Sequence, residues 1–473
     1  MASPNISFSS IPASIRKPGK YFEFNTALAV RTLPGNLQKT LILAQRLAAG
    51  TVAANTPVNV FSDAEAATYF GRGSMAHLMV RAALIANPYL ALTVLAMDDA
   101  GAGVAATSTV TLTGTATSAG VLTLNVGGQQ VQIAIAVGDL NTAVAAALNA
   151  QIAKQPDLPV TATVLSGVVT LTAKHKGTQG NGIKTSVVST AAGATAAATA
   201  MASGATDPTV ATGLAVVFAS GHDIVISPWN DATSLTALRT HLDAVSGPLE
   251  QRGAIGIYGH TGSLANATTL ASGVNSGRIS GILVPSAYHM AYEVAAAYGA
   301  VVASEEDPAR PLNTLALTGI TAPPLANRLS RTEQENALYN GTTPSEVGPG
   351  DKVQIVRAVT TYTLDPQSVP DISLLDLTTI RTLDYVRKAC RERISLRFPR
   401  DKLSARTPAK VRGELLDVLY KLEELEIVEE VEANQDGLIV ERDLQDPNRL
   451  DARIPTDVVN GLHVFAGRID LLL

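Results

Sequence analysis

The clearest candidate for chemistry in this chain is a glycine-rich segment. Residues 101–106 (GAGVAA) fit G-x-G-x-x-A, the outline of a dinucleotide-binding turn. Such a turn needs a helix start to receive a pyrophosphate, but residues 107–113 are rich in Thr, Val and Leu and predict a strand. The preceding pair Asp98-Asp99 would also repel phosphate. This segment is therefore a poor candidate for a nucleotide site.

A second glycine-rich segment, residues 259–263 (GHTGS), lies between an expected strand and an expected helix. It lacks the lysine of a phosphate loop, so a tight turn followed by a helix N-cap at Ser263 explains it better. The seven histidines form no H-x-x-H or H-E-x-x-H pair, and no metal site follows from their spacing. Cys390 is the only cysteine and has no adjacent His or acidic partner, which favours a small buried hydrophobe over a nucleophile.

Composition excludes several further classes of protein. With 473 residues the chain should form two to four domains, and 46% apolar but only 4% aromatic residues predict cores of small and β-branched side chains. The formal net charge of −5 argues against nucleic-acid binding. The N-terminus lacks the apolar region of a signal peptide, and no apolar stretch is long enough to span a bilayer. We expect a soluble protein made in a cytoplasm, with no enzyme activity and no cofactor or metal.

The elements that would position these residues alternate between strands and helices. Before the insert described below we expect a strand at 40–44, helices at 63–70 and 74–86, and a strand at 89–96. After it we expect strands at 223–227, 253–258 and 279–284, each followed by a helix, the first capped by Asn230 or Asp231 and the last at 287–300. Three strand–helix repeats predict a parallel or mixed sheet covered by helices, which the strands on either side of the insert should join.

Residues 107–205 follow a different pattern. Strands that alternate with period two meet at the turn dipeptides Gly127-Gly128 and Ser166-Gly167 and flank a helix after residue 140, which predicts an inserted ββαββ domain. Residues 191–205, rich in Ala, Gly, Ser and Thr, suggest a flexible linker. Residues 313–350 resemble a loop. A final α+β domain should contain a strand at 353–362, helices at 374–396 and 409–431, and strands at 437–443 and 462–473.

Charge is concentrated in that final domain. Residues 381–406 contain nine Arg or Lys and three Asp or Glu, whereas residues 414–432 contain eight acidic residues and one lysine. Two interpretations stay open. The two segments pair within the chain, or a basic surface around Arg387 and Arg391 meets an acidic partner.

Both ends of the chain contain short, alternating apolar runs. Residues 15–24 (IRKPGKYFEF) form the end of a polar arm, and residues 462–473 (LHVFAGRIDLLL) close the chain after Asn460-Gly461. An unpaired strand is a template for pairing with another chain, so both runs are candidates for strand exchange between subunits. The alternative is that each is an edge strand within its own chain.

The arm motif PGKY (18–21), the strand end ISPWND (226–231), the ββαββ insert and the terminal strand together resemble the tail sheath proteins of contractile-tailed phages, most closely the Mu-like type. The resemblance implies a structural subunit that polymerises as stacked hexameric rings around a tail tube and contracts to drive the tube through the host envelope. The implied partners are further copies of the chain, the tail tube protein, and baseplate and tail terminator proteins, but no nucleic acid or membrane. The implied location is the virion, after assembly in the host cytoplasm.

The resemblance also implies an organisation and a set of contact residues. The fold would be multi-domain α/β, with an arm (1–26), a core in two parts (27–106 and 206–350), an outward-facing insert (107–205) and a C-terminal sheath domain with the terminal strand (351–473). The expected inter-subunit strand residues are Tyr21, Phe22, Phe24, Leu462, Val464, Phe465, Ile469 and Leu471. The expected tube-facing basic residues are Arg387, Lys388, Arg391 and Arg393. Two alternatives remain: a baseplate or other tail structural protein, and a nucleotide-binding α/β enzyme.

Overall fold

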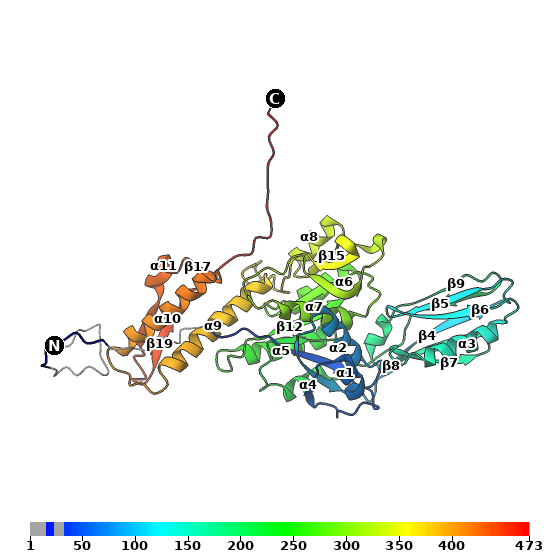
Figure 1. Ribbon diagram of the computed structural model, residues 1–473, viewed down its shortest axis with the longest axis horizontal. Helices are drawn as coiled ribbons and strands as arrows, with labels where there is room; N and C mark the ends of the chain where they lie inside the picture. Colours follow the sequence, from blue (N-terminus) through cyan, green and yellow to red (C-terminus); the bar gives the residue numbers. More distant parts are fainter. Residues whose placement is uncertain (1–15, 23–32, 473) are drawn as a thin grey trace.

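The computed structural model describes residues 16–22 and 33–472. These residues form three parts in a row (Figure 1): a central layered α/β unit, a β-rich unit at one end and a mainly helical unit at the other. The last residues leave the helical unit as an extended segment that runs away from the body (Figure 1). Phe24 lies outside the described residues.

Nine strands form the central sheet, in the order β14-β16-β15-β13-β12-β11-β1-β3-β2. Every pair from β15 to β3 in this order is parallel, and the remaining pairs at the two edges are antiparallel. The bounds are β1 (Lys39–Gln45), β2 (Pro57–Asn59), β3 (Ala91–Met97), β11 (Ile224–Ile226), β12 (Ile255–His260), β13 (Ile279–Leu283), β14 (Ala316–Thr321), β15 (Thr343–Gly348) and β16 (Lys352–Ile355). The predicted mixed sheet is confirmed, and strands from both sides of the insert share it.

Helices cover both faces of this sheet. Leu41 and Leu43 of β1 pack into the core formed with α4, α5 and α6, whereas Ile42 and Ala44 pack into the core formed with α2 and α7. The helices are α1 (Asp63–Phe70), α2 (Met75–Ala86), α4 (Val210–Val216), α5 (Ala232–Ser246), α6 (Leu264–Val274), α7 (Ala291–Ser304) and α8 (Arg331–Tyr339). Because both faces are buried, the inner strands are almost continuously apolar.

Local sequence signals explain where several of these helices begin. The side chains of Asp231 and Ser263 accept hydrogen bonds from backbone amides three residues later and so cap α5 and α6, as predicted. Helix α7 lies directly against β12. At Gly259 an added Cβ would come within 2.2 Å of the Ala291 carbonyl oxygen, so only glycine permits this close packing.

The insert contains the predicted ββαββ unit within a larger β-rich fold. Its sheets are β10-β4-β8-β7 and β6-β5-β9. Its elements are β4 (Ala105–Thr113), β5 (Gly120–Val126), β6 (Gln129–Ile135), α3 (Asn141–Ala153), β7 (Val160–Leu165), β8 (Val168–Lys176), η1 (Thr178–Gly182), β9 (Thr185–Ser189) and β10 (Thr195–Ala198). Gly127, Gly128, Ser166 and Gly167 all have positive φ, as two-residue hairpin turns require.

The prediction of a flexible linker at 191–205 is wrong. Residues Thr195–Ala198 form β10, which pairs with β4, and Ala191, Ala194 and Met201 are buried. Small residues give no strong periodic signal, and here the partner strand supplies the hydrogen bonds that order the segment.

The prediction of a loop at 313–350 is also wrong, since this stretch contains β14, η2 (Leu325–Asn327), α8 and β15, with η3 (Pro349–Asp351) at its end. Ser330 and Glu333 form a capping box at the start of α8, a signal that the sequence contained. The strand expected at 353–362 is shorter and ends at Ile355 with β16.

The helical unit is built on α9 (Leu377–Arg397) and α10 (Thr407–Glu424), followed by β17 (Val428–Glu429), α11 (Val431–Asn434), η4 (Gln435–Gly437), β18 (Ile439–Arg442), β19 (Leu450–Arg453) and β20 (Asp457–Val458). The second helix was expected to reach residue 431. It ends at Glu424 because Glu426 and Glu430 adopt left-handed backbone conformations that break it.

Candidate assembly surfaces and a basic cleft

The C-terminal segment, residues 460–472, forms no strand in the described part of the chain. Its apolar side chains contact little: the exposed fractions are 80% for Leu462, 77% for Val464, 87% for Phe465, 98% for Ile469 and 83% for Leu471. The described part of the segment is therefore not an edge strand of its own chain. Such a run of exposed apolar side chains on an unpaired backbone suits pairing with another chain.

The described part of the N-terminal arm, residues 16–22, also lacks a strand. Phe22 is 89% exposed, and the Tyr21 hydroxyl donates a hydrogen bond to the nearby Lys17 carbonyl at 3.0 Å. The Tyr385 hydroxyl on α9 donates a hydrogen bond to the Pro34 carbonyl at 2.9 Å. This contact fixes the chain to the helical unit just before it enters β1.

Arg393 does not belong to an exposed basic surface, which corrects that prediction. The residue is 4% exposed, and its guanidinium donates to Glu414 at 3.1 Å and to Asp417 at 2.5 Å, both on α10. Arg397 also approaches Glu414, at 3.5 Å. For these residues the basic and acidic segments pair within the chain, which was the simpler of the two interpretations.

The other three predicted basic residues hold α9 against the core unit. Arg387 donates to the Ser246 carbonyl at 2.7 Å, Lys388 to the Gly35 carbonyl at 2.9 Å, and Arg391 to the Gln251 carbonyl at 3.0 Å. Arg387 also pairs with Asp384 at 2.7 Å, which compensates its charge, whereas the acceptors of Lys388 and Arg391 are neutral carbonyl groups.

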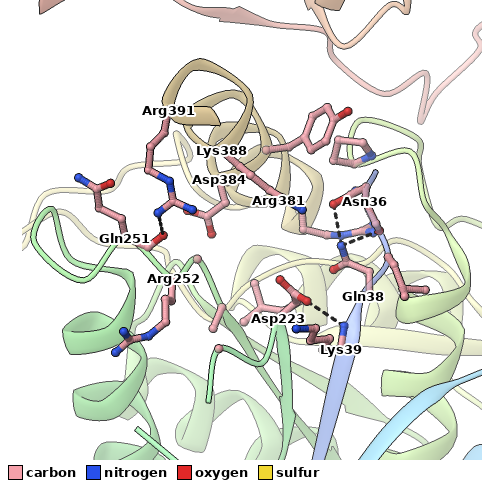
Figure 2. A pocket seen from close by; sticks show the side chains of 17 residues that line it. Asn36, Gln38, Lys39, Asp223, Gln251, Arg252, Arg381, Asp384, Lys388 and Arg391 are labelled. Carbon is pink, nitrogen blue, oxygen red and sulfur yellow. Dashed lines mark hydrogen bonds between the residues drawn. The ribbon is translucent and has the colours of Figure 1, made fainter. Parts of the chain in front are cut away.

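Lys388 and Arg391 also line a cleft of about 280 Å³ between α9 and the core loops (Figure 2). The charged side chains that line it are Lys39, Asp223, Arg252, Arg381, Asp384, Lys388 and Arg391. Five are basic and two are acidic, so the lining has an excess of positive charge.

Arg381 lines this cleft and is only 6% exposed (Figure 2). Its Nη2 donates to the Glu305 carbonyl at 2.5 Å, whereas Nη1 has no hydrogen-bond partner among the described residues. Burial lowers the pKa of Arg381 to about 10, so the side chain stays charged at neutral pH.

The residues first considered for chemistry have structural roles. Residues 101–106 lead into strand β4 and not into a helix, so the predicted objection to a nucleotide site is confirmed. Ser263 caps α6, and the Gly262 amide donates to His260 Nδ1 at 3.1 Å, as expected of a tight turn. Cys390 is buried, and burial raises the pKa of its thiol to about 11.

No group of side chains in the described residues could hold a metal ion, and none of the described helices could cross a membrane.

A polar network that no sequence pattern indicated joins the insert to the core, and we call it the docking network. Asp157 of the insert accepts from Arg72 at 2.8 Å and from Arg81 at 2.8 Å, and Arg81 also binds Asp63. These hydrogen bonds lower the pKa of Asp157 to about 2. Nearby, Asp99 accepts from His175 at 2.8 Å and from buried Gln45. The contacts of Asp157 with Arg72 and Arg81, and of Asp99 with His175, join residues 76 or more positions apart, a separation that no local pattern reveals.

Three family models match the chain. The phage tail sheath protein β-sandwich domain matches residues 101–212, the central domain residues 203–361 and the C-terminal domain residues 369–471. The Mu-like prophage FluMu tail sheath protein of Haemophilus influenzae is 36% identical over 99% of this chain and 100% of its own length.

Two solved structures share the fold. The sheath tail protein of Desulfitobacterium hafniense is 13% identical, with a TM-score of 0.51 over 94% of this chain and 97% of its own. A chain of the anti-feeding prophage baseplate is 10% identical, with a TM-score of 0.51 over 97% of this chain and all of its own. At these identities the structures show the fold alone. The full-length relative and the three domain matches show more: the chain belongs to the phage tail sheath protein family, and its role is that of a structural subunit of a contractile tail sheath.

Proposed function

We propose that copies of this subunit polymerise by pairing their terminal segments with neighbouring copies. The observation that supports this most directly is the C-terminal segment, 460–472, whose apolar side chains are exposed and whose backbone forms no strand. Tyr21 and Phe22 would act in the same way at the other end, together with Phe24. Leu462, Val464, Phe465, Ile469 and Leu471 would be the contact residues of the C-terminal strand.

The polymer would be a stack of hexameric rings around a tail tube that shortens and widens to drive the tube through the host envelope and so permit genome ejection. Energy would be stored in a metastable packing of subunits, without an enzymatic step or a cofactor. The terminal strands would keep subunits joined while the rigid cores rotate, with hinges near Pro18-Gly19 and Asn460-Gly461.

Within the polymer, the basic side of α9 would face the tail tube through Arg387, Lys388 and Arg391, whereas buried Arg393 has no such role. The insert, residues 107–205, would face outward. Baseplate and tail terminator proteins would bind the two ends of the sheath, and assembly would take place in the host cytoplasm before the sheath becomes part of the virion.

Electron microscopy of the purified full-length chain tests this proposal. Hollow, striated tubes of uniform diameter are expected from the full-length chain. A chain that ends at Asn460 should fold equally well but give only dispersed subunits. A chain of full length, with residues 461–473 replaced by a Gly/Ser sequence, controls for the loss of length and should behave like the truncated chain. If the truncated chain or the chain with the Gly/Ser sequence forms tubes, strand exchange through this segment is contradicted. If the full-length chain stays dispersed, a baseplate role is favoured.

A further inference from the structure

We propose that the cleft between α9 and the core unit is a binding site for one oxyanion. The site consists of Lys39, Arg381, Lys388 and Arg391 (Figure 2). A phosphate or sulfate ion would occupy it in the dispersed subunit. In the assembled particle, a carboxylate of a protein chain packed on α9 would supply the same chemistry.

The first argument is the state of Arg381. Its side chain is 6% exposed, lines the cleft and leaves Nη1 without a hydrogen-bond partner in the described residues. Buried donors in folded proteins are nearly always paired, so Nη1 calls for an acceptor. Glu305, Asp307 and Asp223 act on the charge of Arg381 without accepting a hydrogen bond from Nη1. Arg252 contributes less, because its Nη2 binds Glu250 at 2.6 Å and the Phe218 carbonyl at 2.9 Å.

The second argument is that the basic residues of the cleft outnumber the carboxylates that could balance them. Asp384 receives two hydrogen bonds from Arg278, at 2.7 and 3.1 Å, and one from Arg387 at 2.7 Å. Asp223 accepts from the backbone amide of Lys39 at 2.7 Å. Of the two carboxylates that line the cleft, only Asp223 therefore remains to balance Lys39, Lys388 and Arg381, so the lining keeps an excess of positive charge.

The third argument is the chemistry of the unused donors. Lys388 and Arg391 each donate to a neutral carbonyl and retain further N–H groups. Guanidinium and ammonium groups bind oxyanions through short, charge-assisted hydrogen bonds. An oxyanion has several lone pairs that can accept hydrogen bonds. One bound ion can therefore accept from donors on α9 and from donors on the core loops at the same time.

Isothermal titration of the dispersed full-length chain with inorganic phosphate, in a buffer without other oxyanions, tests the site. Wild type should bind one equivalent saturably. The double variant Lys388→Gln/Arg391→Gln should bind at least about tenfold more weakly, because two charged donors are lost. Lys410→Gln, an exposed lysine on α10, is the matched control and should bind like wild type. Circular dichroism would verify that the variants fold. Equal binding by wild type and the double variant, or no binding by wild type, would overturn the proposal.

A second experiment identifies the source of the oxyanion and rests on the proposed polymerisation. Phosphate binding is measured on sedimented polymers of the same chain. Polymers that no longer bind phosphate would show that a carboxylate of a packed neighbour holds the site, whereas unchanged binding would assign the site to the dissolved ion. The measurement on dispersed subunits does not depend on assembly, so failure of the polymer leaves that test intact.

Discussion

Arg393 on α9 donates a hydrogen bond to Asp417 on α10 over 2.5 Å, and this contact joins the most basic segment of the chain to the most acidic one. Glu414 lies 3.1 Å from the same guanidinium, so one buried cation faces two carboxylates. Arg393, which the sequence suggested as part of a surface that binds a partner, therefore connects α9 to α10 within the chain.

Replacement of Arg393 should therefore destabilise the helical unit. In Arg393→Met, two partly buried carboxylates lose their shared cation, and the free energy of unfolding of the α9/α10 pair should fall by about 3 kcal/mol. Hydrogen exchange of amides in the two helices measures this change locally. Arg400→Met, an exposed site just after α9, is the control and should change the value by less than about 0.5 kcal/mol. If the amides of the two helices exchange at the same rate in Arg393→Met and Arg400→Met, Arg393 does not stabilise the helical unit.

Substitutions in the C-terminal segment should separate folding from assembly. Phe465→Ser/Ile469→Ser alters side chains that are 87% and 98% exposed, so the thermal midpoint of the dispersed chain should stay unchanged. Tubes should be lost, because the apolar face of the exchanged strand is removed. Arg468→Ser/Asp470→Ser alters the opposite face of the same strand and should still give tubes. If sedimentation finds no difference between the two double variants, the side chains of this face do not direct assembly.

The insert should be dispensable for polymer contacts. Its entry and exit lie together, since the Val104 amide donates to the Ala205 carbonyl at 2.9 Å, and a short glycine linker can replace residues 107–205 without moving the core strands. Electron microscopy should show tubes of smaller outer diameter. A shortened chain that folds, as judged by circular dichroism and resistance to protease, yet forms no tubes would place subunit contacts on the insert.

The docking network should make the attachment of the insert sensitive to pH through Asp157. The pKa of Asp157 is lowered from 3.8 to about 2 in the folded chain. The stability that its ionised carboxylate contributes is therefore complete above about pH 4 and is lost as the pH falls toward 2. Asp157→Asn lacks the charge at every pH. The thermal midpoints of wild type and Asp157→Asn should therefore differ at pH 6 and converge as the pH falls to 2. Asp401→Asn, an exposed site distant in sequence, should show no such convergence. A constant difference across this range would contradict the network.

Reversal of charge on α9 tests the proposed tube contact. Arg391→Glu is preferred to a change at Arg387, because Arg387 binds Asp384 and its reversal would disturb the core. The variant should fold and form tubes of its own, but should co-sediment less with the tail tube protein than wild type. The wild-type interaction should also weaken with added salt. Lys410→Glu controls for net charge, and normal tube binding by Arg391→Glu would exclude α9 from the contact.

Periodicity alone predicted the core of the fold. The alternation of apolar strands with capped helices indicated the mixed sheet, and Gly127-Gly128 marked a hairpin that the structure contains. Such signals are local, because side-chain period and backbone φ depend on neighbouring residues only. Strand β10 escaped prediction because alanine and threonine show no periodic contrast, and its place is fixed by β4, which precedes it by about 80 residues.

The sequence by itself determined the class of the fold, the absence of a helix after the glycine-rich turn at 101–106 and the apolar pattern of the terminal segments. Only the tertiary structure decided which charges are used internally. Arg393 and Arg391 are two residues apart on one helix, yet the first is buried against α10 and the second borders the cleft. A helix turns by about 200° over two residues, so neighbours of equal charge face different surroundings. The long-range packing around the helix, not the charge count, then sets what each residue does.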